Sequence, residues 1–149
     1  GQFDQFSKAD TYLKSKLILA GAADTEPFSV SDYALYEDGF LTAYEVTQLD
    51  LPNTQLVVLS ACETGLGEIQ SGEGVWGLQR AFQLAGAQSV MGSLWKISDE
   101  ATVKFMDAFY EHYLRTKNIS QAYRHAMQTT RQEYPQPYYW GAFTLIGGN

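Results

Sequence analysis

The sequence predicts one α/β domain with a mostly parallel sheet. Short apolar runs rich in β-branched residues alternate with segments of helical periodicity, in the order strand, loop, short helix, strand, helix, strand, helix, helix, strand. No repeat, low-complexity tract or linker divides the 149 residues, and 45% of them are hydrophobic. Length and composition therefore predict a single packed core over residues 1–149.

The first third of the chain predicts a strand, a loop and a short helix. Residues 17–21 are an apolar run that ends at a glycine, which is typical of a strand. Residues 22–38 contain Pro27 and several Ser and Asp without a sustained period, which indicates a loop. Residues 41–49 have the apolar spacing of one short helix, and Pro52 separates it from the next element.

The next element is expected to be a buried strand at the centre of the sheet. Residues 56–59 are Leu-Val-Val-Leu, and small residues follow at once. Cys62 then lies at the carboxyl end of this strand, the edge at which open parallel sheets bind their ligands. It is the only cysteine in the chain, so two interpretations stay open: a nucleophile, or a small buried side chain.

The rest of the chain alternates helices and strands after a glycine-rich surface loop at residues 63–74. The expected elements are a helix over 75–85, a strand over 89–95, helices over 98–115 and 119–133, and a strand over 139–146. Ser98 or Asp99 is expected to cap its helix. Five side chains of that helix are expected to face the core: Val103, Met106, Phe109, Tyr110 and Tyr113.

Charge and composition exclude several classes of partner. Ten basic and seventeen acidic residues give a net charge of −7, without a basic cluster, which argues against nucleic acid and anionic membranes as direct partners. The sequence has no apolar run of membrane-spanning length and no signal-peptide pattern, so we expect a cytoplasmic protein. A single cysteine excludes a disulfide framework and a multi-cysteine zinc site.

One stretch imitates part of a calcium-binding loop. Gly39 and Glu45 have the spacing of its sixth and twelfth positions, but the first and third positions fall on Ala34 and Tyr36, which supply no carboxylate. A glycine turn followed by a short helix explains the pattern better, and we expect no metal.

A second stretch imitates a dinucleotide fingerprint. Gly65 and Gly67 follow a strand, but Gln70 stands where the third glycine belongs. We therefore expect no nucleotide cofactor.

The two histidines of the chain are weak candidates for a catalytic base. His112 and His125 both fall inside predicted helices, beside the apolar stripe of each. A base for Cys62 should instead come from a strand end or loop that faces the thiol.

Four stretches of the sequence resemble the CHAT domain, a caspase-like peptidase family found attached to tetratricopeptide repeats. They are Leu-Val-Val-Leu-Ser-Ala-Cys-Glu-Thr-Gly at 56–65, Gly-Glu-Gly-Val-x-Gly-Leu-x-Arg-Ala-Phe-x-x-Ala-Gly-Ala at 72–87, Ser-Leu-Trp-x-x-x-Asp at 93–99, and Tyr-Trp-x-x-Phe-x-Leu-x-Gly at 139–147. Residues 17–21 and 38–45 are similar as well, so the resemblance covers nearly the whole chain.

The resemblance implies a caspase-like three-layer α/β/α sandwich and a cysteine–histidine dyad with Cys62 as the nucleophile. The family's histidine stands in an Ala-Thr-His-Gly motif, and Gly1 resembles the glycine of that motif. The histidine would then precede residue 1, and residues 1–149 would be the C-terminal portion of the domain. The resemblance also implies that the backbone N–H groups of Gly1 and Cys62 form the oxyanion hole.

The stretch from Trp95 to Asp99 is similar to a segment of separases, which cleave after arginine. The similarity implies that Trp95 and Asp99 bind substrate, with Asp99 as a pocket carboxylate for a basic P1 side chain. A helix cap remains the other interpretation of Asp99.

Two functions follow from the resemblance. The first is a cysteine endopeptidase that acts on a protein substrate in the complete protein, whereas this chain alone is expected to be inactive. The alternative is a catalytically silent domain for interaction or regulation. The resemblance also implies a tetratricopeptide-repeat region or a regulatory protein as partner.

Overall fold

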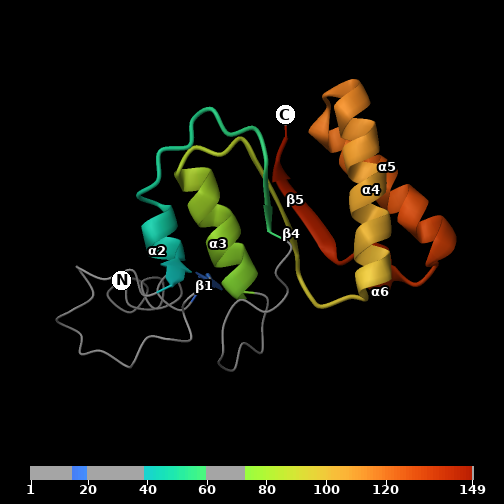
Figure 1. Ribbon diagram of the computed structural model, residues 1–149, viewed down its shortest axis with the longest axis horizontal. Coiled ribbons are helices and arrows are strands. Elements are labelled where there is room, and N and C mark those ends of the chain that lie inside the picture. Colours follow the sequence, from blue (N-terminus) through green and yellow to red (C-terminus); the bar gives the residue numbers. More distant parts are fainter. Residues whose placement is uncertain (1–14, 20–38, 60–72, 149) are drawn as a thin grey trace, which may run out of the picture.

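The computed structural model describes residues 15–19, 39–59 and 73–148 of the chain, and it is a mixed α/β structure. Helices lie on both sides of a three-stranded sheet (Figure 1). One side carries α2 (Ala43–Val46) and α3 (Glu73–Leu84), and the other carries α4 (Asp99–Thr116) and α5 (Ile119–Glu133). The predicted α/β class is confirmed in the described ranges.

The three-stranded sheet has the order β3 (Val57–Leu59), β4 (Ser89–Ser93), β5 (Phe143–Gly147). The strands β3 and β4 are parallel, because α3 carries the chain back to the starting edge of the sheet. The strand β5 is antiparallel to β4. Parallel pairing is therefore found for β3 and β4, whereas β5 departs from the predicted mostly parallel sheet.

The direction of β5 follows from the short helix α6 (Pro137–Trp140). We predicted one strand over residues 139–146, but Pro137 begins a helical turn there, since its fixed φ suits the start of a helix. The chain then enters the sheet where β4 ends, and the Leu94 N–H donates a 2.8 Å hydrogen bond to the Ala142 carbonyl.

A second, two-stranded antiparallel sheet pairs β1 (Lys16–Ile18) with β2 (Phe40–Thr42). The helix predicted over residues 41–49 is therefore shorter, because its first residues belong to β2. Thr42 sets the start of α2 through a capping box with Glu45, in which each side chain bonds the other's backbone N–H. Glu45 thus serves as a cap residue.

The long helices begin and end close to the predicted positions. The helix α5 has the predicted bounds, and α4 ends one residue later than expected. After α3, Gly86 has a φ of +107°, and a Cβ there would lie 3.0 Å from the Pro52 backbone nitrogen. Glycine is therefore required at this turn.

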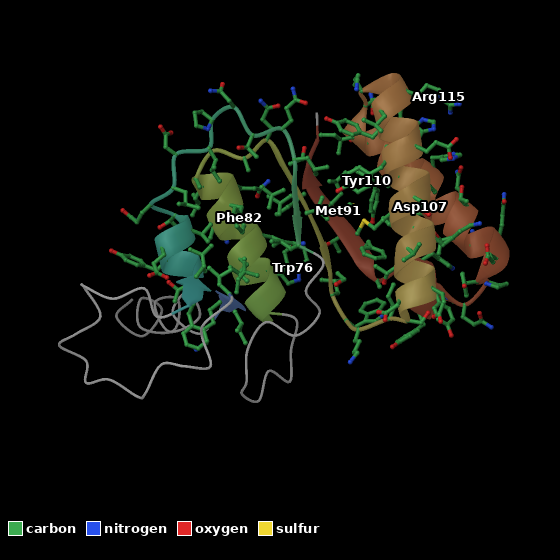
Figure 2. All side chains as sticks on the ribbon, in the orientation of Figure 1. Trp76, Phe82, Met91, Asp107, Tyr110 and Arg115 are labelled. Atoms are coloured by element: carbon green, nitrogen blue, oxygen red, sulfur yellow. The ribbon has the colours of Figure 1, made fainter. Side chains whose placement is uncertain are left out.

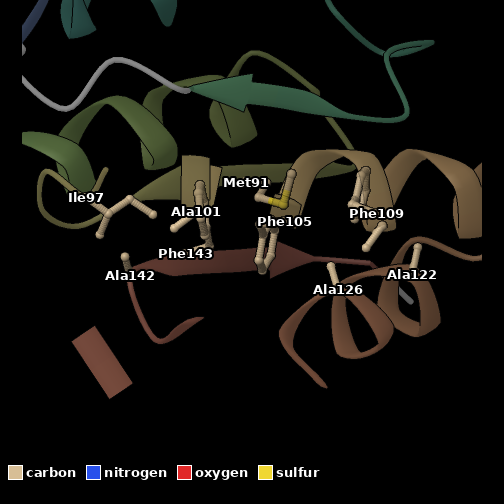
Figure 3. Close-up of a cluster of buried hydrophobic side chains, with 10 residues drawn as sticks. Met91, Ile97, Ala101, Phe105, Phe109, Ala122, Ala126, Ala142 and Phe143 are labelled. Carbon is tan, nitrogen blue, oxygen red and sulfur yellow. The ribbon is translucent and has the colours of Figure 1, made fainter. Parts of the chain in front are cut away.

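Two buried clusters cover the two faces of the sheet, because neighbouring β4 side chains point to opposite faces. Val90 belongs to the cluster under α2 and α3, and Met91 to the cluster under α4 and α5. In the second cluster Phe105 stacks on Phe143 with ring centroids 4.0 Å apart (Figure 3). Small side chains let α4 and α5 approach closely at their contact: Ala101, Ala108, Ala122 and Ala126.

The buried face of α4 is narrower than predicted. Phe109 is fully buried, and Met106 and Tyr113 pack partly against the same cluster. Val103 and Tyr110 were predicted to face the core as well, but they are 56% and 42% exposed. The prediction failed for these two because apolar spacing shows which face is hydrophobic, whereas the sheet covers only part of that face.

Candidate active site

The strands β3 and β4 end at the same edge of the sheet. Leu59, the last residue of β3, is in register with Gly92 of β4, and parallel strands have their carboxyl ends on one side. In the sequence, Cys62 follows Leu59 by three positions, and Trp95 follows Gly92 by three. Cys62 and Gly1 both lie outside the described residues. The structure therefore describes β3, the strand that precedes Cys62 in the sequence, and does not describe the thiol itself.

Trp95 is held in place by a reciprocal contact with α6. Its Nε1–H donates a 2.9 Å hydrogen bond to the Tyr138 carbonyl, and the Tyr138 hydroxyl donates to the Lys96 carbonyl. The two rings also stack, with centroids 6.2 Å apart and an angle of 28° between their planes. The contact ties the segment after β4 to the segment before β5, while 38% of Trp95 and 53% of Tyr138 stay exposed.

Asp99 is the first residue of α4, and Ser98 is its N-cap. The Ser98 hydroxyl accepts a hydrogen bond of 3.3 Å from the Ala101 N–H, so the first turn is capped without Asp99. Within the described residues, the exposed Asp99 carboxylate makes no hydrogen bond or ion pair. The residue that caps α4 is therefore Ser98, and Asp99 is not the cap.

The polar side chain of Gln79 supports this edge of the sheet from the α3 side. It is completely buried, and its Nε2–H donates a 2.9 Å hydrogen bond to the Thr144 hydroxyl on β5. That hydroxyl donates in turn to the Gly92 carbonyl at 3.3 Å. The chain of contacts links α3, β5 and β4 at the level where β3 ends.

The two histidines lie on the helix pair and contact each other. His112 of α4 stacks on His125 of α5 with ring centroids 4.6 Å apart, and His112 Nδ1 accepts a 3.3 Å hydrogen bond from Arg115. Partial burial, His125 and Arg115 together hold the pKa of His112 below its usual 6.5, against the opposing effect of Glu111. His112 lies thirteen positions after Asp99 on α4, about 20 Å along the helix, so the histidine pair is remote from the edge where β4 ends.

In the described ranges, no three side chains of His, Cys, Asp or Glu gather closely enough to hold a metal ion. None of the helices described there has the length and apolar character needed to cross a membrane.

Comparison with known proteins identifies the family. The family model of the CHAT domain matches residues 1–148. The chain belongs to the CHAT domain family. It is 34% identical over 146 residues to the human (Homo sapiens) Tetratricopeptide repeat protein 28. The aligned region covers 97% of this chain and 6% of that protein. It is 32% identical over 151 residues to the mouse (Mus musculus) protein of the same name, again over 6% of the relative. The chain thus spans a small part of the length of the relatives it matches.

The contact of Trp95 with Tyr138 in this CHAT domain was not predicted. Tyr138 stands 43 positions after Trp95 in the sequence, directly after Pro137, and its spacing carries no helical or strand period that would pair the two rings. Tyr138 immediately precedes residues 139–147, a stretch that resembles the family. This position was the one signal in the sequence that could have linked Tyr138 to the site.

Proposed function

We propose that this CHAT domain is part of a cysteine endopeptidase with a caspase-like α/β/α sandwich and Cys62 as its nucleophile. The observation that carries the proposal is the parallel pair β3 and β4, whose carboxyl ends share one edge. Helices on both sides of the sheet are consistent with the sandwich. We assign the histidine of the dyad to polypeptide that precedes residue 1, as the family resemblance implies. His112 and His125 are poor candidates, because they lie on the helix pair, remote from the edge where β4 ends.

The chemistry proceeds in two steps. The histidine takes the proton of the Cys62 thiol, and the sulfur attacks the carbonyl carbon of the scissile peptide bond. The backbone N–H groups of Gly1 and Cys62 stabilise the oxyanion that forms. The histidine then gives its proton to the leaving amine, a thioester remains on Cys62, and water hydrolyses it to release the acid and the thiol.

Substrate binding falls to the segment that follows β4. Trp95 offers an exposed aromatic face that is fixed by Tyr138, and the Asp99 carboxylate is unpaired within the described residues. An unpaired carboxylate in this segment would bind a basic P1 side chain through charge-assisted hydrogen bonds. The relatives' name, Tetratricopeptide repeat protein 28, supports a repeat region of the complete protein as the partner that presents or regulates the domain.

The test uses the complete protein with Cys62→Ala. Cleavage of a peptide panel with Arg, Lys, Asp, Leu and Met at P1 should disappear, while the melting temperature should stay nearly unchanged. Residues 1–149 alone should cleave nothing. Cleavage by the Cys62→Ala variant would exclude Cys62 as the nucleophile.

Thiol reactivity gives a second measurement that needs no substrate. In the complete protein the histidine should lower the thiol pKa, so that iodoacetamide alkylates Cys62 well below pH 8.5, the ordinary range of a free cysteine. A profile centred near pH 8.5, together with no cleavage by the wild-type protein, would leave the catalytically silent interaction domain as the function.

A further inference from the structure

The segment between β4 and α4 is fixed by the fold at both of its ends. At its start the Leu94 N–H donates a 2.8 Å hydrogen bond to the Ala142 carbonyl, directly before β5. At its end Ile97 is buried in the cluster under α4 and α5. Trp95 and Lys96 lie between these two points, and both are exposed. Sheet and core therefore anchor the ends of the segment, and the exposed middle is positioned by contacts with α6.

Tyr138 of α6 supplies these contacts. Its hydroxyl donates a hydrogen bond to the Lys96 carbonyl, and its own carbonyl accepts the Trp95 Nε1–H at 2.9 Å. Its ring stacks on the Trp95 ring. A phenylalanine at this position would keep the stack and the backbone acceptor. The hydroxyl, which reaches the Lys96 carbonyl, is therefore the part of the contact that requires tyrosine.

Tyr138 is itself held by the rest of the fold. Pro137 fixes the φ angle at the start of α6, and its carbonyl accepts a 2.8 Å hydrogen bond from the Gly141 N–H. The Tyr138 ring meets the Tyr139 ring edge to face, with centroids 5.4 Å apart. Tyr139 packs against the cluster under α4 and α5, and α6 lies beside the start of α4 (Figure 1). The tyrosine therefore transmits the position of the core to Trp95.

We propose that Tyr138 is a positioning residue for the cleavage reaction: it holds Trp95 at the edge where β4 ends and thereby sets the affinity for the peptide substrate. The inference rests on the proposed function, in which Trp95 binds substrate. Without the contact, the substrate would have to order the Trp95 side chain as it binds, which costs affinity. Asp99 belongs to α4, whose first turn is capped by Ser98, so its position does not depend on the Tyr138 hydroxyl. The effect should therefore be the same for basic and apolar P1 side chains.

The test uses Tyr138→Phe in the complete protein, with the panel of Arg, Lys, Asp, Leu and Met peptides. KM should rise by about 2- to 10-fold, the factor that one hydrogen bond is worth, and by the same factor for every P1 side chain. The value of kcat should stay nearly constant, because binding that is lost equally from ground state and transition state changes KM alone.

Tyr110→Phe is the matched control. Tyr110 lies on α4 (Figure 2), is 42% exposed, and its hydroxyl makes no hydrogen bond within the described residues. This variant should leave both KM and kcat unchanged. Wild-type KM values for Tyr138→Phe would overturn the proposal. A lower kcat at unchanged KM would overturn it as well, because that result indicates a smaller fraction of folded enzyme and hence a purely structural tyrosine.

Hydroxyl-radical footprinting of the complete protein tests the positioning without a substrate. In Tyr138→Phe the oxidation rate of Trp95 should rise at least about twofold, because the indole leaves the stack more often. Trp76 of α3, which is 50% exposed, serves as the internal reference (Figure 2). If the wild-type protein cleaves no peptide, the proposed function is wrong, and footprinting alone decides the positioning role. Unchanged oxidation of Trp95 in Tyr138→Phe would then exclude that role too.

Discussion

Gly92 on β4 lies directly against the side chain of Gln79 on α3. A Cβ at position 92 would lie 2.6 Å from the Gln79 Nε2, which is already bonded to the Thr144 hydroxyl. The Oε1 of this buried glutamine has no hydrogen-bond partner in the described structure. An alanine at position 92 would therefore force the buried, hydrogen-bonded Gln79 side chain to move, at the edge where β3 and β4 end.

Gly92→Ala should destabilise the domain by about 1–3 kcal/mol, because the added methyl group forces a buried, hydrogen-bonded side chain to move. Denaturant unfolding measures the loss. Gln79→Leu removes the unpaired oxygen with little change in volume and should cost less than about 1.5 kcal/mol. In the double variant the cost of Gly92→Ala should shrink, since leucine lacks the terminal atom that obstructs the methyl group. Additive effects would show that the contact with Gln79 does not restrict position 92.

The stability contributed by His112 should decrease as the pH falls. Its pKa in the folded protein is lowered from 6.5 by partial burial, His125 and Arg115, so the unfolded chain binds this proton more readily. The contribution is therefore complete above pH 6.5, decreases as the pH falls below it, and levels off below the folded-state pKa. Protonation also removes the Nδ1 acceptor that Arg115 uses.

Melting temperatures at pH 7.5 and 5.5 test this for the wild type and His112→Gln. The variant should lose less stability between the two pH values, because the titrating ring is gone while the carboxylates of the chain stay the same. An identical decrease in both proteins would show that His112 does not contribute to acid sensitivity.

Substitutions at the start of α4 should separate stability from specificity. Ser98→Ala removes the hydroxyl that accepts from the Ala101 N–H and should cost about 1 kcal/mol of stability without a change in substrate preference.

Asp99→Asn keeps the shape of the side chain and removes its charge, so the melting temperature should barely change. In the complete protein kcat/KM for Arg and Lys at P1 should then fall selectively, by about 30-fold or more. An unchanged ratio of basic to apolar P1 substrates would remove Asp99 from the substrate pocket.

Local sequence signals predicted much of the fold. The bounds of α5 were predicted correctly because the residues that end it are close in sequence: Asn118 caps its first turn, and two prolines follow its last. The strands that became β3 and β4 were predicted from continuous apolar runs. The family resemblance, which rests on residues 56–65 and the following motifs, was confirmed over residues 1–148.

Contacts between distant residues were decided by the tertiary structure. The direction of β5 depends on where α6 returns the chain to the sheet, and Trp95 meets Tyr138 across 43 positions. The exposure of Val103 and Tyr110 depends on how far the sheet extends under α4. Caps and periodicity act over about four residues, so they predict the ends and the apolar face of a helix. They carry no information on which element covers that face, because packing joins residues that are far apart in the sequence.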